Sequence, residues 1–141
     1  MDELPDLLLS HYEDAYHRGR CERATHGSQT HDPNTMHFVM LQLRVSDECV
    51  IEEAWFDSQG CVYCEAPASI LAQYCESKSI AELIEFDDVC YLALTKLDQV
   101  AGPSSCHMLP WAALQNALRS TDIEYEGSHP MFGGPSLGEE S

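Results

Sequence analysis

Near the beginning of the chain, mostly apolar side chains recur at spacings of three and four residues. They are Leu4, Leu7, Leu8, His11, Tyr12 and Ala15. This period is that of one face of an amphipathic helix, which we expect to end near Gly19. Residues 20–35 contain Gly, Ser, His, Asp, Pro and Asn without a clear period, so we expect a loop there with room for one edge strand.

Apolar and polar residues then alternate from Met36 to Val45. One side of this run carries His37, Val39, Leu41, Leu43 and Val45, and the other carries Phe38, Met40, Gln42 and Arg44. A period of two is typical of a strand with one buried side. A turn over residues 46–48 leads to a second strand from Val50 to Asp57, so the pair is predicted to form a β-hairpin or a meander unit.

Helical periodicity returns after Pro67. A proline is tolerated in the first turn of a helix, where its missing N–H has no partner to lose, so we expect a helix with Pro67 in its first turn. Ser79 followed by Glu82 is a capping box, which predicts a short helix through Phe86.

Two more helices are predicted further along the chain. Asp87 or Asp88 can cap the first of them, and its apolar residues step by three and four. These residues are Val89, Leu92, Ala93 and Leu97. A break follows at residues 102–103, which are Gly and Pro, and residues 108–120 are predicted to form the last helix.

The order of these elements predicts the fold class. A helix followed by strands and then by several helices favours one α+β domain, with a small antiparallel sheet of about three strands packed against the helices. We expect this domain to cover residues 1–123. Residues 124–141 are rich in Gly, Pro and Ser, so we expect a disordered C-terminal tail.

The chain is strongly acidic, with 24 Asp and Glu residues against 7 Lys and Arg residues and a formal net charge of −17. Such a charge repels phosphate backbones, so nucleic acid is not expected as a partner. It fits a soluble surface or a basic protein partner. No apolar run approaches the roughly 20 residues that cross a bilayer, and the first ten residues lack the positive charges of a secretory signal. We therefore expect a cytoplasmic protein without membrane contact.

Seven cysteines are the residues most suited to chemistry. They stand at positions 21, 49, 61, 64, 75, 90 and 106. In a reducing compartment cysteines serve as core residues, metal ligands or sulfur carriers, and an odd number argues against a closed disulfide framework. Cys49 lies at a predicted strand start, and Cys75 and Cys90 lie within helical patterns, so we expect these three to pack in the core. The role of Cys21 stays open.

Cys61 and Cys64 form a C-x-x-C pair directly after Gly60, where a strand gives way to a helix. Helix N-terminal amides favour the thiolate, the form that binds metal or attacks sulfur. A thioredoxin-like redox motif also precedes a helix, but that fold needs βαβ crossovers that this order of elements lacks. A single pair of this kind is half of a tetrahedral zinc site.

The other ligands of such a site must come from distant positions. Cys106 stands just before the last predicted helix, His107 follows it, and His37 begins the first clear strand. Any one of the cysteines could equally be a core residue, because unpaired Cys is among the most buried residue types. Two cysteines at similar loop-to-helix junctions nevertheless favour a shared site.

Two stretches of the sequence resemble a known family. The run AWFDSQGCVYCEAPASIL resembles the region of the middle cysteine in the IscU/SufU family of scaffolds, which includes the NifU N-terminal domain. The run SSCHMLPWAALQNAL resembles that family's last cysteine and closing helix. The resemblance covers roughly residues 6–120. It implies an IscU/SufE-like fold in which three cysteines and an aspartate hold zinc or a nascent iron-sulfur cluster, with sulfur delivered as persulfide by a cysteine desulfurase.

The resemblance also implies particular site residues. Cys61 corresponds to the middle cysteine and Cys106 to the last, whereas Thr35 replaces the first cysteine and His37 replaces the aspartate. A threonine hydroxyl is a poor ligand for zinc or iron, and a neutral imidazole is a good one. The implied metal ligands are therefore His37, Cys61 and Cys106, with Cys64 as a further candidate. Cys106 and Cys61 are the candidate sulfur acceptors.

Taken together, these features predict an iron-sulfur cluster assembly protein that acts as a scaffold or sulfur acceptor and not as an enzyme. Its cargo would be an iron-sulfur cluster or zinc, and its partners would be a cysteine desulfurase and apo iron-sulfur proteins. One alternative is a degenerate family member that keeps a structural zinc, or no metal, and serves as a protein-binding module. Another is a zinc-dependent sulfurtransferase that accepts persulfide from the desulfurase. Thr35 favours the binding module, whereas His37 favours a retained metal.

Overall fold

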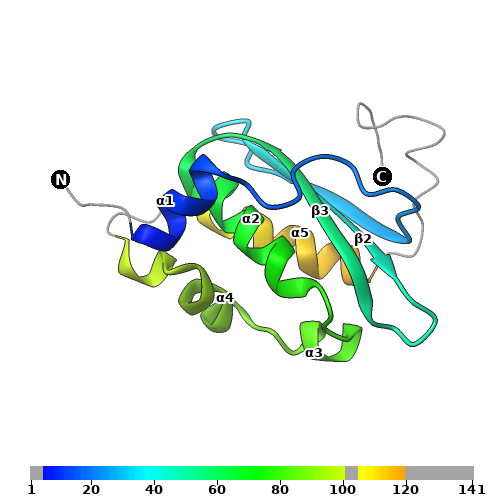
Figure 1. The fold of residues 1–141 in the computed structure, drawn as a ribbon. Coiled ribbons are helices and arrows are strands. Elements are labelled where there is room, and N and C mark those ends of the chain that lie inside the picture. Colours follow the sequence, from blue (N-terminus) through cyan, green and yellow to red (C-terminus); the bar gives the residue numbers. More distant parts are fainter. Residues whose placement is uncertain (1–4, 101–104, 120–141) are drawn as a thin grey trace.

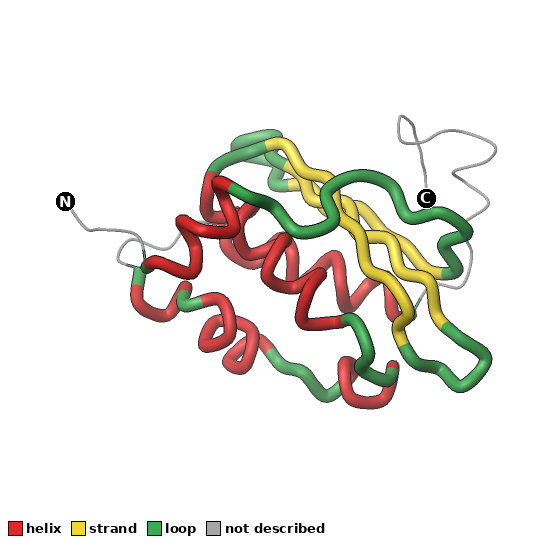
Figure 2. Tube along the Cα trace, viewed as in Figure 1, coloured by secondary structure: helices red, strands yellow, loops and turns green. Residues whose placement is uncertain are grey.

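The computed structural model describes residues 5–100 and 105–119. Within these ranges the chain forms a three-stranded antiparallel sheet in the order β1-β2-β3 (Figures 1 and 2). The strands are β1 (His26–His31), β2 (Phe38–Val45) and β3 (Ile51–Gln59). The helices are α1 (Asp6–Glu13), α2 (Val62–Cys75), α3 (Ile80–Ile84), α4 (Asp88–Thr95), α5 (Leu109–Leu118) and the 3₁₀ turns η1 (Leu97–Gln99) and η2 (Ser105–Met108). The α+β class is thereby confirmed, and the edge strand allowed for in residues 20–35 is β1.

The core lies between one face of the sheet and the helices α2 and α5. Leu41 pairs with Phe56 and Leu43 with Ala54 across β2 and β3, and all four side chains are buried. Helix α2 packs on β3, and α5 packs on β1 and β2. Helices α1 and α4 contact α2 on the side away from the sheet (Figure 1). Helix α2 is therefore enclosed by the sheet and by these helices.

The second face of β2 is also buried, which differs from the predicted strand with one buried side. Met40 is 4% exposed and Gln42 is 1% exposed. The segment between α1 and β1 covers this face, since the Cys21 N–H donates to the Gln42 side-chain oxygen at 2.9 Å. The Gly19 N–H also donates to the Phe56 carbonyl at 2.7 Å. A polar side chain such as Gln42 can be buried because this backbone amide satisfies it.

Helix α1 ends at Glu13, earlier than the predicted end near Gly19. The following residues bond to other elements instead of continuing the helix. The Tyr16 N–H donates to the Ser69 hydroxyl at 2.7 Å, and the His17 carbonyl accepts from the Phe56 N–H at 3.1 Å. Tertiary hydrogen bonds thus override the helical period of the sequence.

Helix α2 begins at Val62, so the prediction that Pro67 lies in its first turn is wrong. Pro67 lies buried inside the helix. A proline within a helix removes one backbone hydrogen bond, which is costly in an isolated helix. The burial of most of α2 offsets this cost. The earlier start places Cys61 at the N-cap and Cys64 in the first turn.

The capping box of Ser79 and Glu82 is confirmed at the start of α3, although α3 ends at Ile84 and not at Phe86. Asp87 caps α4, as one of the two predicted alternatives, by accepting the Cys90 N–H at 2.9 Å.

The apolar face predicted for α4 is wrong at two positions, because Val89 is 68% exposed and Ala93 is exposed as well. Tyr91 and Thr95 point inward instead and are fully buried. Both hydroxyls have acceptors, which makes burial of these polar groups tolerable.

Helix α5 has the predicted position to within two residues at each end. The predicted break at residues 102–103 and the predicted tail at 124–141 lie outside the described residues. None of the helices in the described ranges has the length and apolar character needed to span a membrane.

Candidate metal centre

Three separate segments bring the predicted site residues together. His37 lies immediately before β2, Cys61 and Cys64 lie at the start of α2, and Cys106 lies in η2. Ligand atoms of His37, Cys61 and Cys64 all lie within 4.8 Å of one another. The sulfur atoms of Cys61 and Cys106 are 3.2 Å apart. His37, Cys61 and Cys64 therefore meet at one end of the domain, and Cys106 touches this group through the Cys61 sulfur.

The spacing of the His37, Cys61 and Cys64 ligand atoms, all within 4.8 Å of one another, suits a small metal ion. In a tetrahedral zinc site each ligand atom lies about 2.0–2.3 Å from the metal, so the ligand atoms lie roughly 3.5–4 Å from one another. The His37 Nδ1 atom is buried and has no hydrogen-bond partner among the described residues. A buried ring nitrogen without a partner is costly unless something else binds there. The clustered donors, one imidazole and two thiols, therefore fit zinc or iron, and the Cys106 thiol adjoins them through Cys61.

Gly60 leaves the space that these side chains share. A Cβ at this position would lie 2.5 Å from the Cys64 sulfur and 2.8 Å from His37 Cγ. Both contacts are shorter than van der Waals distance, so a side chain here would push one of the candidate ligands aside.

Burial controls the protonation of Cys64, whose side chain is fully buried. Loss of hydration raises the pKa of this thiol to about 12, with smaller contributions from the charges of Cys61 and Cys106. Without a metal the Cys64 thiol is therefore protonated at neutral pH, and it donates to the Cys61 carbonyl at 3.4 Å. A metal ion bound by this sulfur would displace the proton.

Tyr91 fixes the segment that carries Cys106. Its hydroxyl donates to the His107 carbonyl at 2.5 Å, which joins α4 to η2. Burial raises the pKa of Tyr91 well above its ordinary value, so the hydroxyl stays protonated and remains a donor. The His107 ring packs against Tyr63 at 5.0 Å between ring centroids, and burial lowers its pKa. His107 thus packs beside the centre as a neutral ring.

Thr35 has a role in the turn before β2. Its hydroxyl donates to the buried Asp32 carboxylate at 2.9 Å and accepts from the His37 N–H at 3.2 Å. Met36, between them, has a left-handed φ of 65°. The threonine therefore holds the backbone of His37 in place.

The remaining cysteines divide by exposure. Cys75 is fully buried, as predicted, and Cys21 is buried as well. The prediction that Cys49 and Cys90 pack in the core is wrong, because both are exposed. Cys49 lies in the turn between β2 and β3 with a φ of 65°, and Cys90 lies on the outer side of α4, next to the inward-pointing Tyr91.

Two residues that shape the centre were not predicted as functional. Gly60 could have been noticed, because it directly precedes the C-x-x-C pair. Tyr91 has no comparable signal in the sequence, since its role depends on where α4 lies relative to η2.

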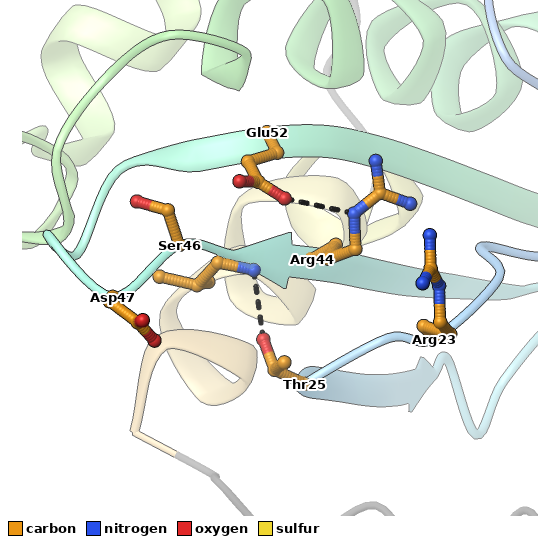
Figure 3. A pocket seen from close by; sticks show the side chains of 7 residues that line it. Arg23, Thr25, Arg44, Ser46, Asp47 and Glu52 are labelled. Atoms are coloured by element: carbon orange, nitrogen blue, oxygen red, sulfur yellow. Dashed lines mark hydrogen bonds and ion pairs between the residues drawn. The ribbon is translucent and has the colours of Figure 1, made fainter.

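A shallow pocket of 320 Å³ lies at the opposite end of β2, around Arg44 and Arg23 (Figure 3). Arg44 is paired there with Glu52 at 3.0 Å and with Glu53 at 3.1 Å. The charge of Arg44 is thereby neutralised by protein carboxylates.

The fold and the centre define a class of protein, a small α+β domain with a Cys and His cluster at one end of a three-stranded sheet. Residues 4–126 match the NifU-like N-terminal domain family. The chain belongs to this family. Its members are scaffolds and not enzymes, in agreement with the prediction from the sequence. Comparison with curated proteins gives no match.

Solved structures share the fold. A hypothetical protein solved at 2.3 Å resolution is 20% identical, with a TM-score of 0.67, and the match covers 81% of this chain and 95% of that one. A candidate iron-sulfur cluster assembly scaffold protein of the SUF system from Fervidobacterium islandicum AW-1 is 16% identical, with a TM-score of 0.62 and coverage of 82% and 96%. The N-terminal NifU-like protein from Brucella abortus is 14% identical, with a TM-score of 0.63 and coverage of 82% and 91%.

Proposed function

We propose that this protein takes part in iron-sulfur cluster assembly as a scaffold or sulfur acceptor. The observation that carries the proposal is the convergence of His37, Cys61 and Cys64, with the Cys106 sulfur in contact with that of Cys61. Membership of the NifU-like N-terminal domain family supports it. The metal ligands in this proposal are His37, Cys61 and Cys106, with Cys64 as the fourth.

The cargo of the centre is an iron-sulfur cluster or a zinc ion. Thiolates are the usual ligands of iron in such clusters, and an imidazole can replace a thiolate. Zinc accepts the same donors in a closed tetrahedral site. The presence of Cys64 beside Cys61 supplies a third sulfur in a chain that has Thr35 at the position of the first family cysteine.

The partners in this proposal are a cysteine desulfurase, which supplies sulfur as persulfide, and apo iron-sulfur proteins, which receive the cluster. We place the protein in the cytoplasm, where thiols stay reduced. The net charge of −17 argues against a nucleic-acid partner and favours a basic docking surface on the protein partner.

The test is the metal and acid-labile sulfide content of the full chain purified without oxygen, together with its visible absorbance. Iron with sulfide is the result expected for a scaffold. Zinc at one ion per chain without sulfide would instead favour zinc-dependent sulfur transfer or a structural zinc site. Absence of any metal in protein that is folded by circular dichroism would contradict the proposed centre.

Variants test which residues belong to the centre. We expect Cys61→Ser and Cys106→Ser each to lower the metal content well below that of the wild-type chain, because a serine hydroxyl is a poor zinc or iron ligand. Cys75→Ser and Cys49→Ser are the controls, one buried and one exposed, and both should keep the metal. Equal metal content in all four variants would show that the site has been assigned to the wrong residues.

One observation favours a second candidate function. The Thr35 hydroxyl is hydrogen-bonded to Asp32 and to the His37 N–H, so this side chain contributes to the structure of the turn. It has no thiol that could accept sulfur. A family member of this kind could keep a structural zinc and act as a protein-binding module. Zinc that does not exchange and a failure to accept sulfur from a desulfurase would favour this function.

A further inference from the structure

Two of the candidate ligands differ sharply in accessibility. Cys61 is partly exposed at the N-cap of α2, whereas Cys106 is 3% exposed. Their sulfur atoms are 3.2 Å apart. A disulfide has a sulfur-sulfur distance of about 2.05 Å, so the two atoms would have to approach each other by roughly 1.2 Å to form one. A sulfur donor from outside can therefore reach Cys61 more easily than Cys106, while Cys106 lies directly behind it.

From this asymmetry we propose that the protein releases sulfide by itself, with Cys61 as the sulfur acceptor and Cys106 as the resolving cysteine. The inference rests on the proposed function, because it requires that Cys61 receives persulfide sulfur. It adds an activity to the centre, namely the internal reduction of sulfane sulfur to sulfide.

The chemistry balances without an external electron donor in the release step. A persulfide donor first transfers its outer sulfur to Cys61, which becomes Cys61–S–SH, and leaves as a thiol. The Cys106 sulfur then attacks the inner sulfur of this persulfide. The bond between Cys61 and Cys106 forms, the bond to the outer sulfur breaks, and that sulfur leaves with the electron pair and with the Cys106 proton as hydrogen sulfide.

The electron count follows from the bonds. The sulfane sulfur gains two electrons, and the two cysteine sulfurs together lose two as they become a disulfide. A dithiol reductant must then reduce this disulfide before the next round. While the disulfide persists, two of the proposed metal ligands are occupied, so sulfide release and metal binding alternate at the same residues.

Cys64 is less well placed for the resolving role. Its thiol donates to the Cys61 carbonyl oxygen at 3.4 Å, so it is directed toward the backbone of Cys61. The Cys106 thiol, in contrast, contacts the Cys61 sulfur itself. The geometry therefore assigns the attack to Cys106.

The experiment uses the full chain with two exposed cysteines replaced, Cys49→Ser and Cys90→Ser, so that they do not take up sulfur. The reduced, chelator-treated protein is loaded with glutathione persulfide, and excess donor is removed at once. Released sulfide is trapped with monobromobimane, and the state of each cysteine is read by alkylation and peptide mass spectrometry. The same measurement is made on this background with Cys106→Ser, with Cys106→Ala and with Cys64→Ser.

We expect the parent and the Cys64→Ser variant to release sulfide and to form a disulfide between Cys61 and Cys106. Both Cys106 variants should release at least about tenfold less and keep the extra sulfur on Cys61. Equal release from the Cys106 variants, loss of release in Cys64→Ser alone, or a persulfide that persists on Cys61 in the parent would overturn the inference while leaving sulfur acceptance intact. If Cys61 takes up no sulfur in any variant, the inference and the sulfur-acceptor function are both wrong.

Discussion

At Gly60 the absence of a side chain has a direct consequence for the metal centre. An added Cβ would lie 2.5 Å from the Cys64 sulfur and 2.8 Å from His37 Cγ. We therefore expect Gly60→Ala to weaken metal binding although it removes no ligand, because one of these two side chains must move. The measurement is zinc affinity by competition with a chromophoric chelator, and the expected loss is about tenfold or more.

Gly19→Ala is the matched control for this substitution. Gly19 has a φ of 142°, so an alanine there strains the backbone and lowers the stability of the domain. Its Cβ would contact only Trp55, at 3.6 Å, among the side chains described. Gly19→Ala should thus lower the melting temperature and keep zinc affinity. Equal zinc affinity in Gly60→Ala and wild type would show that the space at Gly60 is not needed by the ligands.

Individual site residues were predictable from the sequence to different degrees. Cys61 and Cys64 stood out because a C-x-x-C pair lies between a strand and a helix, and Cys106 because of its resemblance to the last cysteine of a family. Tyr91 did not stand out, because a tyrosine within a helical pattern gives no sign that its hydroxyl will reach a carbonyl 16 positions away. Residues that act through contacts between distant segments need the three-dimensional structure.

The capping box at the start of α3 allows a test at the level of one element. The Ser79 hydroxyl accepts the Glu82 N–H at 3.1 Å, and the Glu82 carboxylate accepts the Ser79 N–H at 2.8 Å. We expect Ser79→Ala to reduce the free energy of unfolding by about 1 kcal/mol, because a helix amide loses its partner. Urea denaturation followed by circular dichroism measures the change.

Glu82→Gln separates the hydrogen bond from the charge, since an amide oxygen can still accept the Ser79 N–H. These hydrogen bonds lower the pKa of Glu82 below its ordinary value of 4.5. The ionised carboxylate therefore stabilises the fold above pH 4.5, and this contribution is lost as pH falls through the lowered pKa of the folded state. Glu82→Gln should be slightly less stable than wild type at pH 7 and should approach it in acid. A constant difference at all pH values would contradict this account.

Helix boundaries and strand burial show which features of the fold the sequence patterns predicted and which they did not. The capping box and the assignment of β2 as a strand were reliable because they depend on neighbouring residues, whereas the single buried side predicted for β2 was wrong. The start of α2 was missed because Pro67 was assigned to the first turn by a local rule, whereas burial on several sides stabilises the helix through that proline. Burial of Gln42 was likewise set by a distant segment, the loop that contains Cys21.

The charge of the whole molecule leads to a prediction about salt. With 24 acidic and 7 basic residues, the folded chain carries strong self-repulsion at pH 7. Salt screens such repulsion, so we expect the melting temperature to rise between 0.02 M and 0.5 M sodium chloride, by roughly 4 °C for each 1 kcal/mol gained. Potassium chloride is the control and should have the same effect at the same ionic strength. A melting temperature that falls with both salts would mean that ion pairs outweigh repulsion.

Metal binding should stabilise the whole domain and not only the centre. The four candidate ligands belong to the start of β2, the start of α2 and η2, so one ion bound to them would tie the sheet to two helical segments. A ligand that binds only the folded state at 100 times its Kd adds about 2.7 kcal/mol, which corresponds to a rise in melting temperature on the order of 10 °C for a domain of this size.

The measurement for this last prediction is thermal unfolding of the chelator-treated full chain with and without zinc. Wild type and the exposed control Cys49→Ser should both show the rise, and Cys61→Ser should show little or none because it lacks the sulfur at the junction of β3 and α2. An acidic surface can also bind cations weakly, so the same rise in Cys61→Ser would assign the effect to surface carboxylates. A rise that depends on Cys61 and is absent with magnesium would show that the thiols hold the ion, because magnesium prefers oxygen ligands.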